Sequence, residues 1–491
     1  MTGTGTGSVF KNALVFGTAP VLQRLAALLL LPYFTHYLAP ADYGAIELIA
    51  FWTGLFVVVF GMEYRSGFLW RMAAAVDLEG QRRIVTASVC LVAVLAILAV
   101  STFAATGAPL LALQTGAPPA RMLMLVLALA LFVDLVGVLL MAVLQAQQRA
   151  ARMVGLGLVQ FVIDALLKIE LVANRGMGVT GFFAASAVAS ASTALLSLWA
   201  VRDLLRVRMT VAAMRAECVV IVRYSAPLLW GAVAYLLVRK IDRPLLAETL
   251  SVAALGVYGR AARLTQLVLD FYVVPFQRSF DVWRLSVNAR GEGLEPVART
   301  YRWFMLGAGL VATGVATVGC DLFTGLADEQ YAAVRLQVPL LNVAMLCQCG
   351  ATVAASAFFV TQRTGAWTRI FVAGLAIEIA VALVVARPLG VPGVAFALAC
   401  AHGFLWWAAA HFGKRLWPVP YDHRAAVLVI AAASLLSCAR AWLPAGQFWL
   451  AMCIDTGLVL GYLVIASWCA HVRVADWMMV ILRVRAHILR R

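Results

Sequence analysis

The sequence predicts an all-α, polytopic membrane protein with about 14 transmembrane helices. Of its 491 residues, 64% are hydrophobic and only 13% are charged, and the mean hydropathy is +0.92. In soluble proteins, roughly 25% of residues are charged. A membrane-spanning helix needs about 20 apolar residues, so about 14 helices would use roughly 280 residues and leave only short loops. This arithmetic excludes a fused ATPase or glycosyltransferase domain.

The chain contains fourteen apolar segments that are long enough to span a bilayer. We expect helices at 10–37, 44–70, 84–105, 121–146, 152–173, 179–201, 222–243, 251–277, 300–322, 334–360, 367–386, 391–412, 424–443 and 448–470. The longest segments between them, near 202–222 and 278–299, are basic and are expected to be loops.

The distribution of basic residues predicts the orientation. The formal net charge is +16, from 39 Lys and Arg against 23 Asp and Glu. With both termini in the cytoplasm, the cytoplasmic loops carry roughly three times as many Arg and Lys as the opposite loops, as is usual for membrane proteins. We therefore expect both termini in the cytoplasm, and we attribute the positive charge to topology rather than to nucleic-acid binding.

Four short patterns recur in the same order about 210 residues later, which indicates an internal repeat. The pairs are Ala19-Pro20 with Ala226-Pro227, Tyr43-Gly44 with Tyr258-Gly259, Gln148-Arg149 with Gln362-Arg363, and Gly178-Val179-Thr180-Gly181 with Gly390-Val391-Pro392-Gly393. We expect two pseudo-symmetric six-helix bundles, 1–201 and 222–412, joined by a cytoplasmic linker, 202–221. Residues 413–491 would add a helix pair and a basic tail. Transporters with repeats often bind substrate in a central cavity between the halves.

Several basic residues are expected within the membrane, where a charge costs a few kcal/mol and usually faces a cavity or a partner. Arg24 has no acid within its own segment. Arg260, Arg263, Gln266 and Asp270 follow one another at steps of three, three and four, which places them on one helix face. We interpret this face as a cavity wall with an excess of positive charge; a self-neutralising structural network is the alternative.

The intramembrane acids allow two interpretations. Asp164 precedes Lys168 by four residues, an orientation that favours an ion pair within one helix, although both could also be polar cavity or ion-coupling groups. Asp134, Glu378 and Asp455 are isolated acids, each either a proton or cation site or the partner of a buried Arg. His402 and Trp406, one turn apart, are interpreted as core packing.

No motif predicts a cofactor or a metal site. The chain lacks a Gly-rich phosphate loop and a His-Glu-x-x-His zinc signature. Cys347 and Cys349 form a lone pair without further ligand residues nearby, and a metal site usually shows more ligands than that. We therefore expect a protein that is not an enzyme and has no cofactor.

Four sequence motifs carry a resemblance to a known family. They are Ala39-Pro40-Ala41-Asp42-Tyr43-Gly44, Gly61-Met62-Glu63 followed by Arg65, Asp242-Arg243, and Gly256-Val257-Tyr258. Together with the expected six plus six plus two helices, the chain resembles the Wzx-type polysaccharide flippases, of the multidrug/oligosaccharidyl-lipid/polysaccharide (MOP) exporter superfamily. The resemblance covers essentially the whole length.

The resemblance implies a V-shaped pair of bundles around a cationic cavity, in the bacterial inner membrane. Its substrate would be an undecaprenyl-diphosphate-linked oligosaccharide, moved from the cytoplasmic to the periplasmic leaflet for capsule, exopolysaccharide or O-antigen synthesis. Arg24, Arg260 and Arg263 would then bind the diphosphate. Besides this lipid-linked substrate, the expected partners are membrane lipids and a polysaccharide polymerase, without nucleic acid.

Two alternatives remain open. A cation-coupled small-molecule or multidrug antiporter of the same superfamily typically carries an acid in its first helix, whereas no Asp or Glu precedes Asp42 in this chain. A membrane enzyme, such as a polymerase or an acyltransferase, should carry a large extramembrane loop with catalytic His or carboxylate residues, and the expected loops are short and basic.

Overall fold

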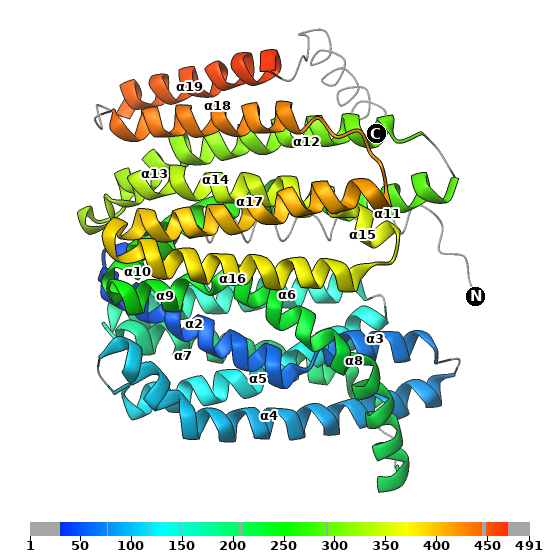
Figure 1. The fold of residues 1–491 in the computed structure, drawn as a ribbon. Helices are drawn as coiled ribbons and strands as arrows, with labels where there is room; N and C mark the ends of the chain where they lie inside the picture. The colour runs from blue at the N-terminus through cyan, green and yellow to red at the C-terminus, as the bar shows by residue number, and fades with distance from the viewer. Residues whose placement is uncertain are drawn as a thin grey trace. The chain divides into compact units, whose positions relative to one another are not determined.

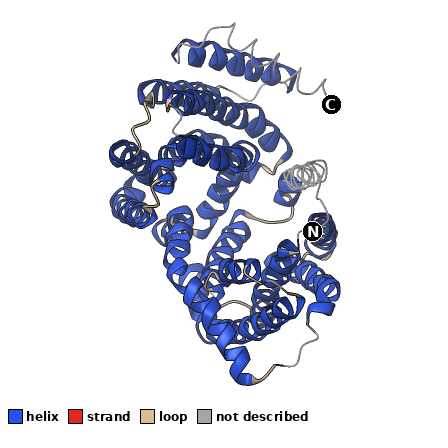
Figure 2. Ribbon diagram, turned by 90° about the vertical axis from the view of Figure 1, so that its right-hand side faces the viewer, coloured by secondary structure: helices blue, strands red, loops and turns tan. Residues whose placement is uncertain are grey.

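The computed structural model describes residues 30–75, 77–116, 118–147, 149–205, 209–290, 293–443 and 448–469. This part of the chain consists of helices and their connections, without strands (Figure 2). The predicted all-α fold class is therefore confirmed. Contacts divide the chain into two compact units, Met1–Gly256 and Val257–Arg491.

The helices of the first unit follow one another with short connections (Figure 1). They are α2 (Pro40–Gly61), α3 (Tyr64–Ala73), α4 (Leu78–Thr115), α5 (Arg121–Ala146), α6 (Ala150–Lys168), the π-helix η1 (Ile169–Asn174), α7 (Gly178–Val201), the 3-10 helix η2 (Arg202–Leu204), α8 (Val211–Lys240) and α9 (Asp242–Thr249).

The second unit contains the remaining helices. They are α10 (Val252–Val268), which begins in the first unit, the π-helix η3 (Leu269–Val273), α11 (Val274–Arg290), α12 (Glu295–Gly314), the π-helix η4 (Val315–Gly319), α13 (Cys320–Leu326), the 3-10 helix η5 (Glu329–Tyr331), α14 (Val334–Ala354), α15 (Ser356–Val360), α16 (Thr364–Leu389), α17 (Val391–Leu416), α18 (His423–Trp442) and α19 (Phe448–Cys469).

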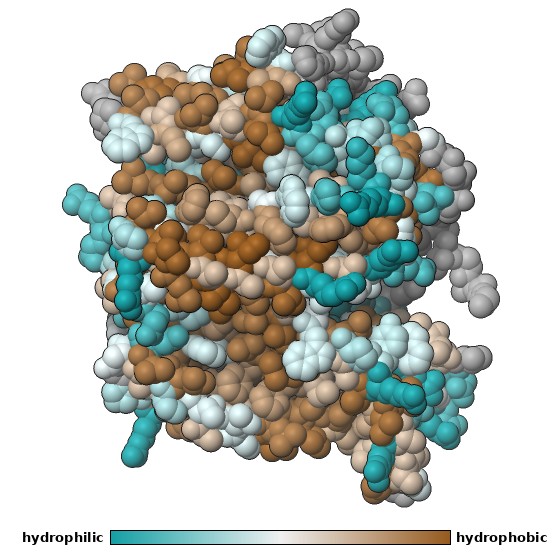
Figure 3. Space-filling model, in the orientation of Figure 1, coloured by the Kyte–Doolittle hydropathy of each residue, from teal (hydrophilic) through white to brown (hydrophobic). Residues whose placement is uncertain are grey.

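Within the described residues, 11 helical segments are long and apolar enough to cross a membrane. A multi-pass membrane protein is therefore confirmed. The first expected segment, 10–37, lies largely outside the described residues, so the number 14 stays a prediction. In the face drawn in Figure 3, apolar side chains cover the middle of α16 and α17, as expected for helices in contact with lipid.

Several predicted boundaries were wrong. The expected helix 44–70 is divided at Met62 and Glu63, whose φ angles of 47° and 50° lie in the left-handed region. The expected loops 202–222 and 278–299 are shorter, because α8 already begins at Val211 and α11 continues to Arg290. Hydropathy marks where the apolar stretch ends, whereas backbone hydrogen bonding continues into charged residues beyond it.

α8 belongs to the first unit. The sequence predicted a helix at 222–243 in this place, as the first helix of the second bundle. α8 packs against α2, α3 and α4. Gly67 of α3 permits this approach, since a Cβ there would lie 2.3 Å from Ser225 Oγ. Arg71 donates from Nε and Nη2 to the two carboxylate oxygens of Glu217, both at 2.9 Å. The prediction that a linker at 202–221 separates two six-helix bundles stays a prediction.

In the second unit, the expected terminal helix pair is α18 and α19, which pack against α12 (Figure 1, orange and red). Tyr462 of α19 is buried and donates its hydroxyl to Leu306 O at 2.9 Å. The same hydroxyl lies over Gly309, where a Cβ would come within 2.2 Å. The pair is thus held by specific packing rather than by chain connectivity alone.

Candidate functional site

The basic face predicted on the second helix of the C-terminal half lies on α10. Arg260 is 7% exposed. Arg263 has a side-chain exposure of 47%, and its Nη1 lies 3.9 Å from Asp270 Oδ2. Gln266, one turn beyond Arg263, is half-buried. Along α10 and the π-helix that follows it, two guanidinium groups accompany one carboxylate, and a cavity wall on this face stays a prediction.

Asp270 lies within the π-helix η3. A π-turn adds one residue to the turn, which rotates the following side chains relative to a regular helix, and such turns are frequent at functional sites. The distance of 3.9 Å between Arg263 and Asp270 is long for a hydrogen-bonded ion pair. Arg263 therefore keeps much of its capacity to donate hydrogen bonds to an anion.

A polar cavity of about 690 Å³ lies inside the first unit, bordered by α2, α3, α5, α6 and α7. Asp134 and Ser190 both line it. Gln160 Nε2 donates to Ser190 Oγ at 3.2 Å. The other polar residues that line the cavity are Thr53, Arg65, Ser186, Thr193 and Ser197. A cavity with a carboxylate, an amide and several hydroxyls can hold water or a small cation.

The predicted ion pair within α6 is present. Lys168 Nζ donates to Asp164 Oδ2 at 2.7 Å, and Ser186 Oγ donates to Asp164 Oδ1 at 2.7 Å. The ammonium also lies 4.0 Å from the centroid of the Phe182 ring. Each charge of the pair has its counter-ion in the same helix, which favours the structural interpretation; a coupling role stays a prediction.

Asp455 is paired with a buried arginine, one of the two interpretations that the sequence allowed. Arg440 Nε donates to Asp455 Oδ1 at 2.5 Å, and both side chains are at most 1% exposed. Arg440 also contacts the carboxylate of Asp321, and Arg335 Nη2 lies 3.5 Å from Asp321 Oδ1. Two arginines and two aspartates thus form a neutral network between α13, α14, α18 and α19.

The other predicted residues lie on helices other than α10 or outside the described residues. Glu378 is buried in α16, with 1% exposure. Arg24 lies outside the described residues. His402 Nδ1 contacts Leu398 O at 2.9 Å, and Trp406 Nε1 donates to the Tyr301 hydroxyl at 3.1 Å. His402 and Trp406 are thus packed within the fold, as the sequence suggested.

Sequence reasoning missed the hydroxyl groups of the cavity in the first unit. Ser186, Ser190, Thr193 and Ser197 recur along α7 at steps of four, three and four, which is the spacing of one helix face. Because small hydroxyl residues are common at helix–helix contacts in membranes, this spacing alone did not distinguish a cavity wall from packing.

Comparison with known proteins agrees with this architecture. The family described as "Polysaccharide biosynthesis protein" matches residues 9–280. No curated protein matches the sequence significantly.

Among solved structures, the lipid II flippase MurJ in an inward closed conformation superimposes with a TM-score of 0.73 at 10% identity, over 92% of this chain and 99% of that chain. A multidrug resistance MATE family transporter of the MOP superfamily, in an inward-facing conformation, gives 0.66 at 16% identity, over 83% and 98%. The chain belongs to the polysaccharide biosynthesis protein family and has the fold of the MOP superfamily transporters.

Proposed function

We propose that the protein flips an undecaprenyl-diphosphate-linked oligosaccharide from the cytoplasmic to the periplasmic leaflet of the bacterial inner membrane. Membership of the polysaccharide biosynthesis protein family supports a glycan cargo. Capsule, exopolysaccharide and O-antigen precursors are the cargo classes that we propose, with a polysaccharide polymerase receiving the product.

The observation that carries the proposal is the basic face of α10. Arg260 is 7% exposed, and it is followed one turn later by Arg263, which is only loosely paired with Asp270. A guanidinium that is shielded from water binds phosphate oxygens strongly, because its planar fork donates two parallel hydrogen bonds. We propose Arg260 and Arg263, together with Arg24, as the groups that bind the diphosphate. Gln266 and Asp270 would be polar neighbours of that site.

The proposal is tested by replacing Arg260 with Ala. A hydrogen bond to a charged group contributes about 1.5–3 kcal/mol, so we expect export of the glycan to fall roughly 10- to 100-fold. Arg260→Lys should restore only part of it, since an ammonium lacks the planar fork. Both glycan export and the amount of protein in the membrane are measured.

The matched control is Arg363→Ala, which removes an exposed arginine from the turn before α16. It should leave export unchanged. Normal export by the Arg260→Ala protein at normal abundance would refute the site. A low abundance of Arg260→Ala together with normal export per molecule would make Arg260 a structural residue.

A second candidate is a cation-coupled antiporter of small molecules with the same fold. The cavity of the first unit favours it, since Asp134 supplies a carboxylate there. Under this alternative, Asp134→Asn would abolish resistance to cationic dyes while glycan export continued. Under the flippase proposal, cells without the protein accumulate lipid-linked precursor and show no change in dye resistance.

A further inference from the structure

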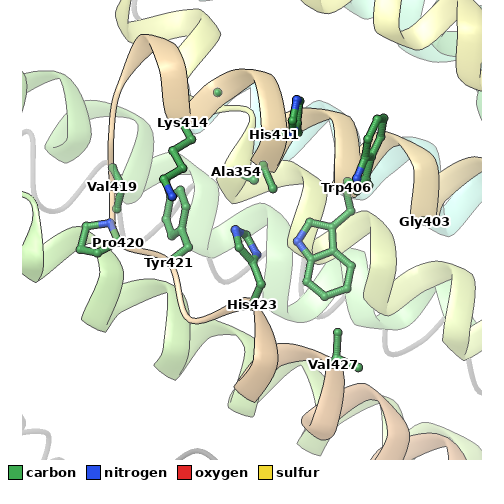
Figure 4. A pocket seen from close by; sticks show the side chains of 14 residues that line it. Ala354, Gly403, Trp406, His411, Lys414, Val419, Pro420, Tyr421, His423 and Val427 are labelled. Carbon is green, nitrogen blue, oxygen red and sulfur yellow. The ribbon is translucent and has the colours of Figure 1, made fainter.

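A second pocket lies in the other unit, between α17, α18 and the segment that connects them (Figure 4). Its volume is about 440 Å³. Its lining residues are Ala354, Gly403, Trp406, Trp407, Ala409, Ala410, His411, Gly413, Lys414, Val419, Pro420, Tyr421, His423 and Val427. None of these residues belongs to the proposed diphosphate site.

The pocket combines apolar walls with nitrogen groups and has no acidic lining residue. Figure 4 shows the Lys414 side chain extending toward Tyr421, with the His423 imidazole between Tyr421 and Trp406. Asp422, beside the pocket in sequence, accepts a hydrogen bond from Ala425 N at 3.0 Å and lies 3.7 Å from Arg302. Asp422 is thus in contact with groups outside the lining, and Lys414 is the lysine of the lining.

The walls of the pocket are fixed by hydrogen bonds below it. Trp406 Nε1 donates to the Tyr301 hydroxyl at 3.1 Å, and that hydroxyl lies 3.4 Å from His423 Nδ1. Tyr301 is completely buried. The imidazole and the indole are thus held in place from α12, so the pocket is a built feature rather than a chance gap between helices.

The position of the pocket indicates the level of the lipid head groups. Lys414 lies in the last turn of α17 and His423 is the first residue of α18, and both helices are long and apolar enough to cross a membrane. Trp and Tyr are enriched at the membrane–water interface, where one end of the ring system is apolar and the other is wet. Among the lining residues, Trp407 is 55% exposed and Lys414 is exposed as well.

We propose that this pocket binds an anionic phospholipid, with the phosphate beside Lys414 and the first acyl carbons against the tryptophans. Basic pockets between transmembrane helices bind anionic head groups. A free phosphate ion would use the positive charge but not the apolar walls, whereas a zwitterionic lipid would use the walls but gain little from the charge. The proposal is independent of which substrate the protein transports.

A bound lipid would contribute to the position of the terminal helix pair. One wall of the pocket is α17, and the opposite wall is α18. A lipid in contact with both walls stabilises their association, and the stability of the folded protein rises with the logarithm of the free lipid concentration once this exceeds the Kd.

The experiment measures thermal unfolding of the purified full-length protein in neutral detergent, during titration with phosphatidylglycerol, phosphatidylcholine or inorganic phosphate. The apparent Kd follows from the rise in Tm with lipid concentration. One lysine near an anionic surface contributes about 1 kcal/mol, so Lys414→Ala should weaken phosphatidylglycerol binding about fivefold. Arg415→Ala, which removes the adjacent exposed charge outside the pocket, should change it less than about twofold.

A second pair of variants tests the apolar wall. Trp407→Ala should weaken phosphatidylglycerol binding, whereas Trp468→Ala, which removes an exposed tryptophan of α19 outside the pocket, should not. Lys414→Gln repeats the charge test if Lys414→Ala does not fold. Equal stabilisation by phosphatidylcholine, equal losses in Lys414→Ala and Arg415→Ala, or full stabilisation by inorganic phosphate alone would each overturn the proposal.

Discussion

At the scale of single residues, most intramembrane charges in the described part are neutralised by a partner, and the partner was only sometimes visible in the sequence. The Asp164–Lys168 pair could be predicted because a spacing of four residues brings two side chains together on one helix. The partner of Asp455 could not, because Arg440 lies on a different helix. Helix packing, which local periodicity does not report, created that contact.

Arg284 illustrates the same limit in a residue that was expected to lie in a loop. It lies in α11, is 7% exposed, and donates to Ser356 at 2.8 Å. Its guanidinium carbon also lies 5.1 Å from the Phe359 ring centroid. A positive charge near a membrane boundary is therefore not by itself a sign of topology, since packing can use the same side chain to join two helices.

We predict that Arg440→Ala destabilises the protein strongly. Removing Arg440 leaves the buried carboxylate of Asp455 without its counter-ion, which costs about 3–5 kcal/mol. Thermal unfolding in detergent measures the loss, and Arg363→Ala is the exposed control. The double variant Arg440→Met with Asp455→Leu should lose less stability than Arg440→Ala, because it removes both charges together. If Arg440→Ala were as stable as the control, the network would not support the fold.

At the scale of helices, hydropathy predicted where helices exist but not where they are irregular. The break at Met62 and Glu63 and the π-helix η3 are separated by about 210 residues, which is the spacing of the predicted repeat. Both interrupt the second expected helix of their half. The two irregularities differ in kind, so the repeat stays a prediction. Neither irregularity could be predicted, because hydropathy does not report backbone dihedral angles.

The family motifs around Gly44 and Gly256 have a packing explanation. A Cβ added to Gly44 would lie 1.8 Å from Val252 O, and a Cβ added to Gly256 would lie 1.8 Å from Pro40 O. The first turns of α2 and α10 thus approach each other through two glycines, one from each helix. Both obstructing atoms are backbone atoms, which cannot move away as a flexible side chain can.

We therefore predict that Gly44→Ala and Gly256→Ala each destabilise the protein by about 1–3 kcal/mol or more, since overpacking forces the helices apart. The yield of monodisperse protein and its Tm are the measurements. Gly231→Ala in α8 is the control, because no atom lies within 4 Å of a Cβ there. That control should be neutral or slightly stabilising, since Ala is the better helix former. Unchanged Tm values for both test variants would mean that the two helices separate without cost.

At the scale of the whole molecule, composition alone predicted the fold class, and the order of motifs predicted the family. The fold class is confirmed, and it was predictable because a 64% hydrophobic chain has few alternatives to transmembrane helices. The family is confirmed by the match to residues 9–280. The substrate site was harder to predict. Arg24, Arg260 and Arg263 were chosen by charge and depth, and in the structure only Arg260 and Arg263 lie in described residues. How these side chains meet a substrate depends on tertiary arrangement, which no local pattern encodes.

The net charge of the proposed cargo leads to a prediction about energetics. A diphosphate head group carries about two negative charges, and an inside-negative potential favours their outward movement by about 2.3 kcal/mol per charge per 100 mV. At 100 mV this amounts to about 5 kcal/mol, which is enough to drive accumulation in the outer leaflet without a nucleotide. The chain contains no phosphate-loop motif that would bind one.

We expect flipping in proteoliposomes to be electrogenic. Imposing an inside-negative potential with a potassium gradient and valinomycin should accelerate outward movement of a lipid-diphosphate oligosaccharide, and collapsing the potential should slow it. Arg260→Ala should reduce the rate at every potential, because it removes a binding group without changing the charge that is moved. A proton gradient applied without a potential is the control that separates electrical from chemical driving force. If the flipping rate did not depend on the potential and flipping required ATP, this mechanism and the assignment of an anionic cargo to the basic face of α10 would both be contradicted.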